Sequence, residues 1–267
     1  IPAGLASAAM QVINRPVLKS LTDDATVGIF QANYRLGIFM MLVVGMFDYA
    51  WRPFFLKHAN DPDAKSLFSR VFTYFCVISM TILVTLSLFL EDLIHVKIGS
   101  VYFIHPDYWS GIVIVPVVLL AYAFNGAYVN FVVGVYLEKK TFYLPYVFGA
   151  GAAVNVTANL LLIPSLGMIG AAYATLFSYV VIAVGIYFSS QKFYRVVYEW
   201  RKIMTLAVIT AAVYATFQIL HLEQGSLMAF VGKGGLLAAF TAALFLGRVI
   251  GLDELRQSKL VLKRAVD

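Results

Sequence analysis

The chain has 267 residues, of which 61% are hydrophobic and 13% are charged, and its formal net charge is +6. A soluble domain is about 45–50% apolar and about 25% charged, so this chain carries roughly half the charge that a surface in water needs. The composition excludes a single soluble globule, a disordered chain and a disulfide scaffold. The apolar residues run continuously instead of alternating, which argues against a membrane β-barrel. We predict an all-α fold, a polytopic bundle of transmembrane helices.

Eight segments of the sequence reach the length of about 20 apolar residues that a spanning helix requires. They cover roughly residues 1–18, 27–51, 68–90, 109–137, 142–163, 168–190, 203–220 and 227–247. No charged residue separates the fifth segment from the sixth. We expect the break at 163–167, where Pro164 stops the incoming helix and Gly167 permits a tight turn. Because the chain opens on Ile1 instead of Met and shows no signal-peptide pattern, we expect a fragment or a processed piece.

Lys and Arg follow every second predicted span. Fifteen of the 20 belong to the connections after spans two, four, six and eight, whereas the other connections hold only Lys19 and Lys97. Cytoplasmic loops of membrane proteins carry an excess of Lys and Arg. The alternation therefore predicts that the even-numbered connections and the C-terminus face the cytoplasm. This topology also explains the positive net charge. Nucleic-acid binding requires basic residues on one exposed face, and nothing in the sequence calls for such a face.

Three cations, Arg15, Arg35 and Lys233, lie inside predicted spans. A cation at the middle of a bilayer costs about 2.5–3.5 kcal/mol, so such residues usually face the bundle interior or a water-filled cavity. At about 1.5 Å per residue, Arg15 lies about 5 Å, Arg35 about 12 Å and Lys233 about 9 Å from the outer end of its helix. All three are therefore expected in the outer half of the membrane.

Polar side chains accompany these cations at helical spacing. One stripe on the first span consists of Gly4, Ser7, Gln11, Asn14 and Arg15. Gln31 shares a face with Arg35 on the second span, and Asn155 and Asn159 lie four residues apart on the fifth. Polar stripes on several helices predict a hydrated cavity with a positive outer half, which suits an anionic substrate. The predicted substrate-binding residues are Gln11, Asn14, Arg15, Gln31, Arg35, Asn155, Asn159 and Lys233.

Several of these residues have a plainer interpretation. Arg15 and Lys233 are near enough to the interface for their side chains to reach lipid head groups. The alternative for Asn155 and Asn159 is hydrogen bonding between helices, worth about 0.6–2 kcal/mol for each bond. Asp48, near the inner end of the second span, is expected to pair with Arg52 four residues later instead of forming a proton site.

No set of residues in the sequence is typical of catalysis. Membrane transferases hold Mg²⁺ on a pyrophosphate with two acidic clusters on one side. Here Asp61 and Asp63 are predicted on the cytoplasmic side, and the pairs Asp23-Asp24 and Glu91-Asp92 on the other. The four histidines have no metal-ligand spacing, and the single cysteine lies in an apolar run. We therefore predict that the protein is not an enzyme and holds no metal or cofactor.

Two stretches of the sequence resemble a known family. IPAGLAS at residues 1–7, continuing through Asn14 and Arg15 to VGIF at 27–30 and ANYR at 32–35, is similar to the seventh and eighth helices of bacterial polysaccharide flippases. NVTANLLLIP at 155–164, followed by Gly167, GAA at 170–172 and Ala174-Thr175, resembles the hairpin between their eleventh and twelfth helices. These flippases belong to the multidrug/oligosaccharidyl-lipid/polysaccharide exporter superfamily, which also contains the MATE drug antiporters and the lipid II flippase.

The resemblance covers the whole chain as helices seven to fourteen of a MATE-like fold. It implies that residues 1–190 form the second six-helix lobe of a transporter, and that 191–267 form two further helices and a cytoplasmic tail. Such a protein would move an undecaprenyl-pyrophosphate-linked oligosaccharide across the bacterial cytoplasmic (inner) membrane by alternating access, for surface polysaccharide synthesis. The implied partners are this substrate, membrane lipids, and the polysaccharide polymerase and glycosyltransferases of the same pathway. Arg15, Arg35 and Lys233 would take the role of cations facing the substrate.

Three other functions stay open. A cation-coupled drug exporter of the MATE type needs membrane-embedded carboxylates, and Asp48 is the one that these spans offer. A membrane glycosyltransferase or phosphotransferase is disfavoured by the placement of its acidic pairs on opposite sides. A structural scaffold would leave the three embedded cations without an explanation.

Overall fold

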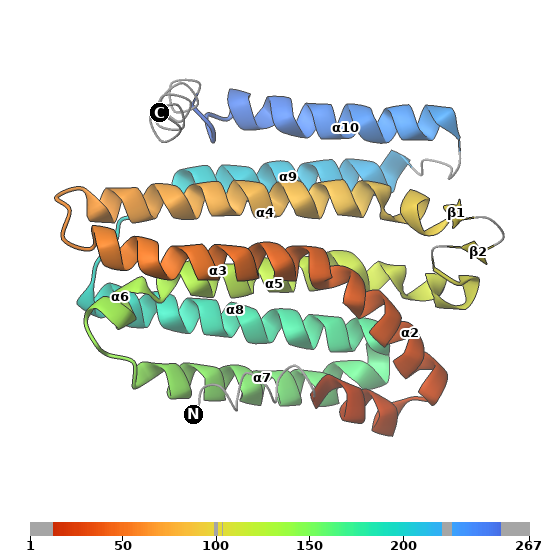
Figure 1. Ribbon diagram of the computed structural model, residues 1–267. Helices are drawn as coiled ribbons and strands as arrows, with labels where there is room; N and C mark the ends of the chain where they lie inside the picture. Colours follow the sequence, from red (N-terminus) through yellow and green to blue (C-terminus); the bar gives the residue numbers. More distant parts are fainter. Residues whose placement is uncertain (1–12, 99–100, 103, 221–225, 252–267) are drawn as a thin grey trace.

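The protein is a bundle of long apolar helices in the computed structural model, which describes residues 13–98, 101–102, 104–220 and 226–251 (Figure 1). Within these ranges, seven helical segments are long and apolar enough to cross a membrane. They are Asp24–His58, Ala64–Ile94, Pro106–Leu137, Tyr143–Leu166, Met168–Phe193, Trp200–Leu220 and Leu227–Leu246. The prediction of a polytopic helical bundle is confirmed, and seven of the predicted spans coincide with these helices. The first predicted span lies mostly outside the described residues, and 13–21 are helical.

The elements follow one another with short connections. They are α2 (Asp24–Tyr34), the 3₁₀ turn η1 (Arg35–Gly37), α3 (Ile38–His58), α4 (Ala64–Ile94), β1 (Lys97–Ile98), β2 (Val101–Tyr102), the 3₁₀ segment η2 (Pro106–Ile114), α5 (Val115–Phe131), α6 (Val133–Leu137), α7 (Tyr143–Leu166), α8 (Met168–Phe193), α9 (Trp200–Leu220) and α10 (Leu227–Leu246). The two short strands form an antiparallel hairpin in which Lys97 pairs with Tyr102.

The helices lie side by side and alternate in direction (Figure 1). α5 occupies the centre, where Val118, Leu119 and Ala121 are fully buried, and it packs against α3, α4 and α8. α7 pairs with α8 on one side of the bundle, while α9 and α10 pack on α4 on the other side. The connections after α3, α6 and α8 consequently meet at one end of the bundle.

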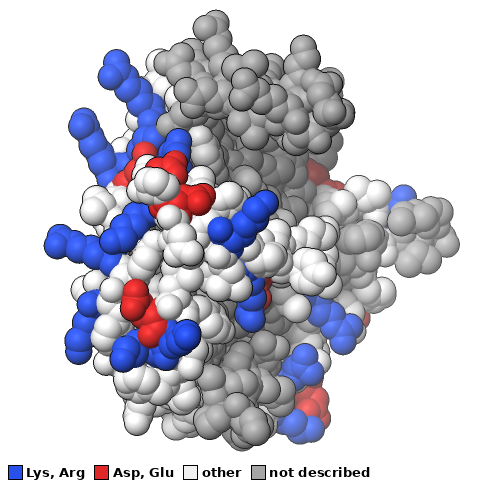
Figure 2. Space-filling model, turned by 60° about the vertical axis from the view of Figure 1, so that its left-hand side comes forward, with Lys and Arg blue, Asp and Glu red and all other residues white. Residues whose placement is uncertain are grey.

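Basic side chains gather at that end of the bundle, the one that the charge pattern predicts to face the cytoplasm. Figure 2 shows this end with many Lys and Arg side chains and few acidic ones. The described basic residues there are Arg52, Lys57, Lys65, Arg70, Lys139, Lys140, Lys192, Arg195, Arg201, Lys202 and Arg248. The fold thus brings together cations that the sequence places in separate connections, as an excess on one side of a membrane requires.

The predicted break between the fifth and sixth spans lies at Gly167, which has a φ of 55° and separates α7 from α8. Glycine adopts positive φ without the clash that a Cβ would cause. The expectation that Pro164 stops the helix is wrong, because α7 continues through Pro164 to Leu166. A proline removes one N–H donor from the helix and can kink it, and here it stands only two residues before the helix ends.

A stripe of small residues lets α7 and α8 approach closely. Ala174 and Ser178 on α8 are fully buried, and the Ser178 hydroxyl donates to the Gly151 carbonyl at 2.7 Å. At Gly170 an added Cβ would lie 2.5 Å from the Leu162 carbonyl oxygen, which belongs to the backbone and cannot rotate away. Small residues are the means by which membrane helices pack at short distance.

Replacing Gly170 with alanine is therefore expected to separate the two helices and destabilise the protein by about 1–3 kcal/mol. The measurement is thermal unfolding of the purified protein in detergent. Gly149→Ala on α7 is the matched control, because nothing lies within 4 Å of a Cβ at that position. Equal stability of the two variants would contradict the close packing inferred here.

Candidate functional site

A polar pocket lies between the helix at 13–21 and α2. Its volume is about 540 Å³. It is lined by Arg15, Pro16, Lys19, Asp24, Val27, Gly28, Gln31, Ala32, Arg35 and Tyr108. Three of the predicted substrate-binding residues, Arg15, Gln31 and Arg35, therefore meet in one place although they come from two helices.

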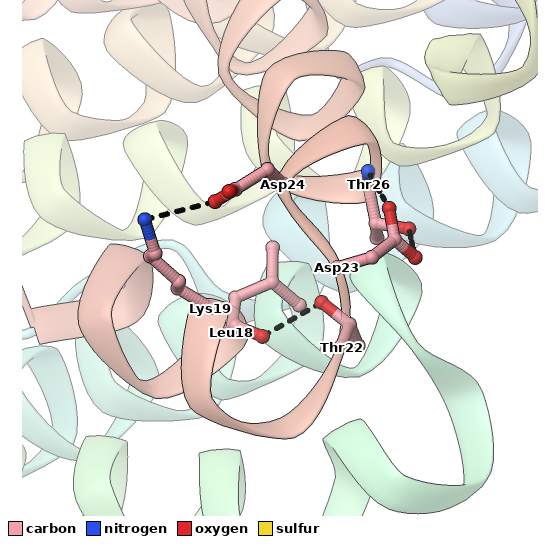
Figure 3. Close-up of polar contacts among 6 residues, drawn as sticks. All are labelled: Leu18, Lys19, Thr22, Asp23, Asp24 and Thr26. Carbon is pink, nitrogen blue, oxygen red and sulfur yellow. Dashed lines mark hydrogen bonds and ion pairs between the residues drawn. The ribbon is translucent and has the colours of Figure 1, made fainter.

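The turn that joins these two helices is held by a short set of polar contacts (Figure 3). Asp23 caps the N-terminus of α2, accepting hydrogen bonds from the Thr26 backbone N–H at 2.8 Å and from the Thr26 hydroxyl at 2.9 Å. These bonds lower the pKa of Asp23 below its usual value, so the cap is lost only when the pH falls through that lowered pKa. Lys19 pairs with Asp24 across the turn at 2.9 Å.

α2 is also fixed against η2, which brings Tyr108 to the pocket. The buried Asn33 side chain donates from Nδ2 to the Tyr108 carbonyl at 2.7 Å. Gly111 makes room for it, since a Cβ there would lie 2.2 Å from Asn33 Nδ2. One face of α2 is thus anchored, while the residues on another face, Gln31 and Arg35, border the pocket.

Arg35 lies at an interruption of the helix. α2 ends at Tyr34, residues Arg35–Gly37 form a 3₁₀ turn, and α3 continues from Ile38 in a different direction (Figure 1). Gly37 packs closely on α5, because a Cβ at that position would lie 2.6 Å from Val118 Cγ1. A 3₁₀ segment inside a long helix often marks a hinge or a strained position. Arg35 therefore lies at the bend of a spanning segment.

The two arginines of the pocket carry its uncompensated charge. The Lys19 ammonium is neutralised by Asp24, whereas the described residues place no carboxylate within 4.0 Å of either Arg15 or Arg35. Both arginines are exposed to the pocket. Guanidinium groups bind phosphate with two parallel hydrogen bonds, so this pair is chemically suited to a phosphate or pyrophosphate.

Asn14, Asn155 and Asn159 form a buried network instead of lining the pocket. Asn159 Nδ2 donates to Asn14 Oδ1 at 2.8 Å, and Asn14 Nδ2 donates to the Thr175 hydroxyl at 2.7 Å. Asn155 and Asn159 are fully buried and Asn14 nearly so. The network ties the helix at 13–21 to α7 and α8, which is the interhelical bonding that the sequence offered as the alternative. These three residues are left out of the proposed site.

Lys233 is also away from the pocket. Its side chain is fully buried on α10, and Nζ lies 2.7 Å from Asp92 Oδ2 on α4. The ammonium also lies 5.9 Å from the centre of the Phe217 ring on α9. Lys233 therefore joins the last two helices to α4, and we do not assign it to the substrate.

Three further predictions concern residues outside the described lining of the pocket. Asp48 accepts two hydrogen bonds from Arg52, at 2.9 and 3.0 Å, which confirms the predicted pair. Gln11 lies outside the described residues. In the part of the chain that the structure describes, no three His, Cys, Asp or Glu side chains come together in a group that could hold a metal ion.

Part of the pocket lining was not predicted from the sequence. Asp24, Gly28 and Ala32 lie on the same helical face as Gln31 and Arg35. Extending that face from Arg35 toward the N-terminus by one step of three and then steps of four residues would have found them. Tyr108 could not be found in this way, because only the contact with Asn33 brings it there.

No family model, no curated protein and no solved structure matches the chain. The residues of the polar pocket and the sequence resemblance to polysaccharide flippases are therefore the features that bear on function.

Proposed function

We propose that the protein moves an undecaprenyl-pyrophosphate-linked oligosaccharide across the bacterial cytoplasmic membrane, and that the polar pocket binds the pyrophosphate. The observation that carries this proposal is the pair Arg15 and Arg35, two arginines without a carboxylate partner among the described residues, facing one pocket. Cations inside spanning segments are costly unless they meet water or an anion. The pyrophosphate of a lipid carrier supplies such an anion while its prenyl chain stays in the bilayer.

The bend at Arg35–Gly37 supports a mechanism of alternating access. Arg35 lies on the 3₁₀ turn between α2 and α3, so a change in that turn would move the guanidinium relative to Arg15. Bound substrate shifts such an equilibrium only when it contacts the two states differently. A pyrophosphate held by both arginines would provide this difference.

The charge pattern supports the proposed orientation of the protein in the membrane. α2, which borders the pocket, lies at the end of the bundle opposite the basic connections (Figure 1). With those connections in the cytoplasm, as we propose, the pocket would face the outer leaflet. The pair formed by Asp48 and Arg52 argues against the alternative of a cation-coupled drug exporter, because this carboxylate is already engaged.

Reconstitution of the protein, expressed from its own gene, tests the proposal directly. Vesicles are loaded with an undecaprenyl-pyrophosphate-linked saccharide, and the fraction accessible to a membrane-impermeant lectin is measured over time. We expect this fraction to rise faster with the protein than in protein-free vesicles. An unchanged rate, together with altered drug accumulation in cells that lack the gene, would favour the drug exporter instead.

A further inference from the structure

A second cavity, unlike the polar pocket, lies among α4, α5, α8 and α9. Its volume is about 480 Å³, which is within the range of ligand pockets, and we call it the apolar crevice. Its walls are almost wholly hydrophobic and come from all four helices, for example from Phe75, Leu120, Ala183 and Ala207. Because these helices are long enough to span a membrane, the crevice lies at the depth of lipid hydrocarbon chains.

Aromatic side chains mark the mouth of the apolar crevice. Tyr187, Phe188 and Trp200 line both the crevice and an adjoining pocket of about 440 Å³, the neck pocket. The rings of Tyr187 and Trp200 meet edge to face, with centroids 5.4 Å apart. Tyr and Trp are enriched at the level of lipid head groups. The mouth is expected at that level, because its aromatic residues lie near the end of α8 and at the start of α9.

The neck pocket continues into a third, which we call the cationic pocket. Arg195 and Val197 line both of them. The cationic pocket has a volume of about 300 Å³ and is lined by Lys65, Ser66, Ser69, Arg70, Arg195, Val197 and Glu199. The three cavities therefore adjoin one another in a row, from an apolar interior to a basic surface at the predicted cytoplasmic end.

The polar groups of the cationic pocket can accept an anion. Ser69 is almost fully buried, yet its hydroxyl has no hydrogen-bond partner among the described residues, and the same holds for Arg70 Nε. Arg195 is exposed, and no carboxylate of the described part of the chain lies within 4.0 Å of it. Arg70 Nη2 lies 4.0 Å from Asp63 Oδ2, so Arg70 offers its Nε donor beside the Ser69 hydroxyl and the Arg195 guanidinium.

The acidic residue of the cationic pocket is already neutralised. One carboxylate oxygen of Glu199 lies 2.8 Å from the Lys202 ammonium, and the other accepts a hydrogen bond from the Thr73 hydroxyl at 2.7 Å. Lys65 is held beside the pocket with its ammonium 5.0 Å from the centre of the Tyr194 ring. The pocket as a whole therefore keeps an excess of positive charge.

We propose that these three cavities bind one anionic glycerophospholipid. One of its two acyl chains occupies the apolar crevice, its glycerol lies in the neck pocket, and its phosphate is bound by Lys65, Arg70, Arg195 and Ser69. Basic pockets between membrane helices on the cytoplasmic side are suited to anionic lipid head groups. This site is separate from the polar pocket, so it does not depend on the function proposed above.

Lipid titration tests this site. The purified protein is placed in phosphatidylcholine nanodiscs, and binding of added phosphatidylglycerol is measured by native mass spectrometry. Replacing Lys65 and Arg195 together by glutamine should weaken binding about 25-fold, since each basic residue near an anionic head group contributes about fivefold. Ala207→Phe, which fills the crevice from an exposed position, should also weaken binding without a change of charge.

Matched controls separate this site from general attraction to anionic lipid. Lys139 and Lys140 are exposed at the same end of the bundle and line none of the three cavities, so their double replacement by glutamine should leave binding unchanged. The proposal is overturned if phosphatidylcholine binds as tightly as phosphatidylglycerol, or if the control pair weakens binding equally. Displacement of the lipid by an equal concentration of glycerol phosphate would likewise overturn it, since the phosphate alone would then account for binding.

Discussion

Replacing Arg35 with alanine is expected to abolish export of the surface polysaccharide without lowering the amount of protein in the membrane. Arg35 is exposed to the polar pocket, so its truncation removes little packing. Losing one partner of a hydrogen-bonded charge pair costs about 2 kcal/mol or more, which corresponds to a loss of binding of about thirtyfold. The measurement is polysaccharide at the cell surface, compared with membrane abundance of the protein on a blot.

Three variants act as controls for Arg35→Ala. Arg35→Lys keeps the charge but loses the two-pronged hydrogen bonding, so export should be reduced and not abolished. The double variant Lys19→Gln with Asp24→Asn removes the ion pair of the same pocket without changing its net charge, and Arg201→Ala removes a cation at the opposite end, where α9 begins. Both of these should export normally. Normal export by Arg35→Ala would remove the role in substrate binding that we assign to this arginine.

The arrangement of the spans could be predicted from the sequence because it depends on local composition. A helix in a bilayer satisfies its own backbone hydrogen bonds, so a long apolar run specifies a spanning helix without knowledge of its neighbours. The seven helices of the described chain accordingly follow the apolar runs, and the turn at Gly167 follows from a residue that tolerates positive φ. The positions of Lys and Arg in the sequence also predicted which connections lie together at the same end of the bundle.

The candidate site could be predicted only in part, because helical periodicity gives the face of a side chain but not its partner. Gln31 and Arg35 share a face and border one pocket, as the spacing indicates. Asn159 and Asn14 also lie on polar stripes, but they are 145 positions apart and bond to each other in the interior. No proline in the sequence predicts the bend at Arg35. The bend lies beside the close contact of Gly37 with Val118, a contact between distant residues that a local sequence pattern cannot predict.

Lys233 is a further residue whose partner could not be predicted from helical periodicity. Its ion pair with Asp92 leads to a prediction of large effect. The ammonium is fully buried, whereas 24% of the Asp92 side chain is exposed. Removing one partner of a buried pair costs about 3–5 kcal/mol, because the remaining charge is left in a medium of low polarity. Asp92→Asn leaves the buried ammonium unpaired, so this variant should lose stability in that range.

Lys233→Met should cost less than Asp92→Asn, because the carboxylate that it leaves behind can still reach solvent. The double variant Lys233→Met with Asp92→Leu removes both charges and should recover most of the stability, since apolar residues often replace a buried pair without loss. Thermal unfolding of the single and double variants in detergent gives the coupling between the two positions. Independent, additive losses would show that the two side chains do not form the pair.

The same variants also distinguish a structural from a substrate-binding role for Lys233. If the ammonium only joins α10 to α4, the double variant should export polysaccharide as well as the unmodified protein does, because the charge is absent but the helices remain packed. If Lys233 instead contacts the substrate, the double variant should be stable and yet inactive. A stable but inactive double variant would therefore return Lys233 to the substrate site and contradict its assignment to the contact between α10 and α4.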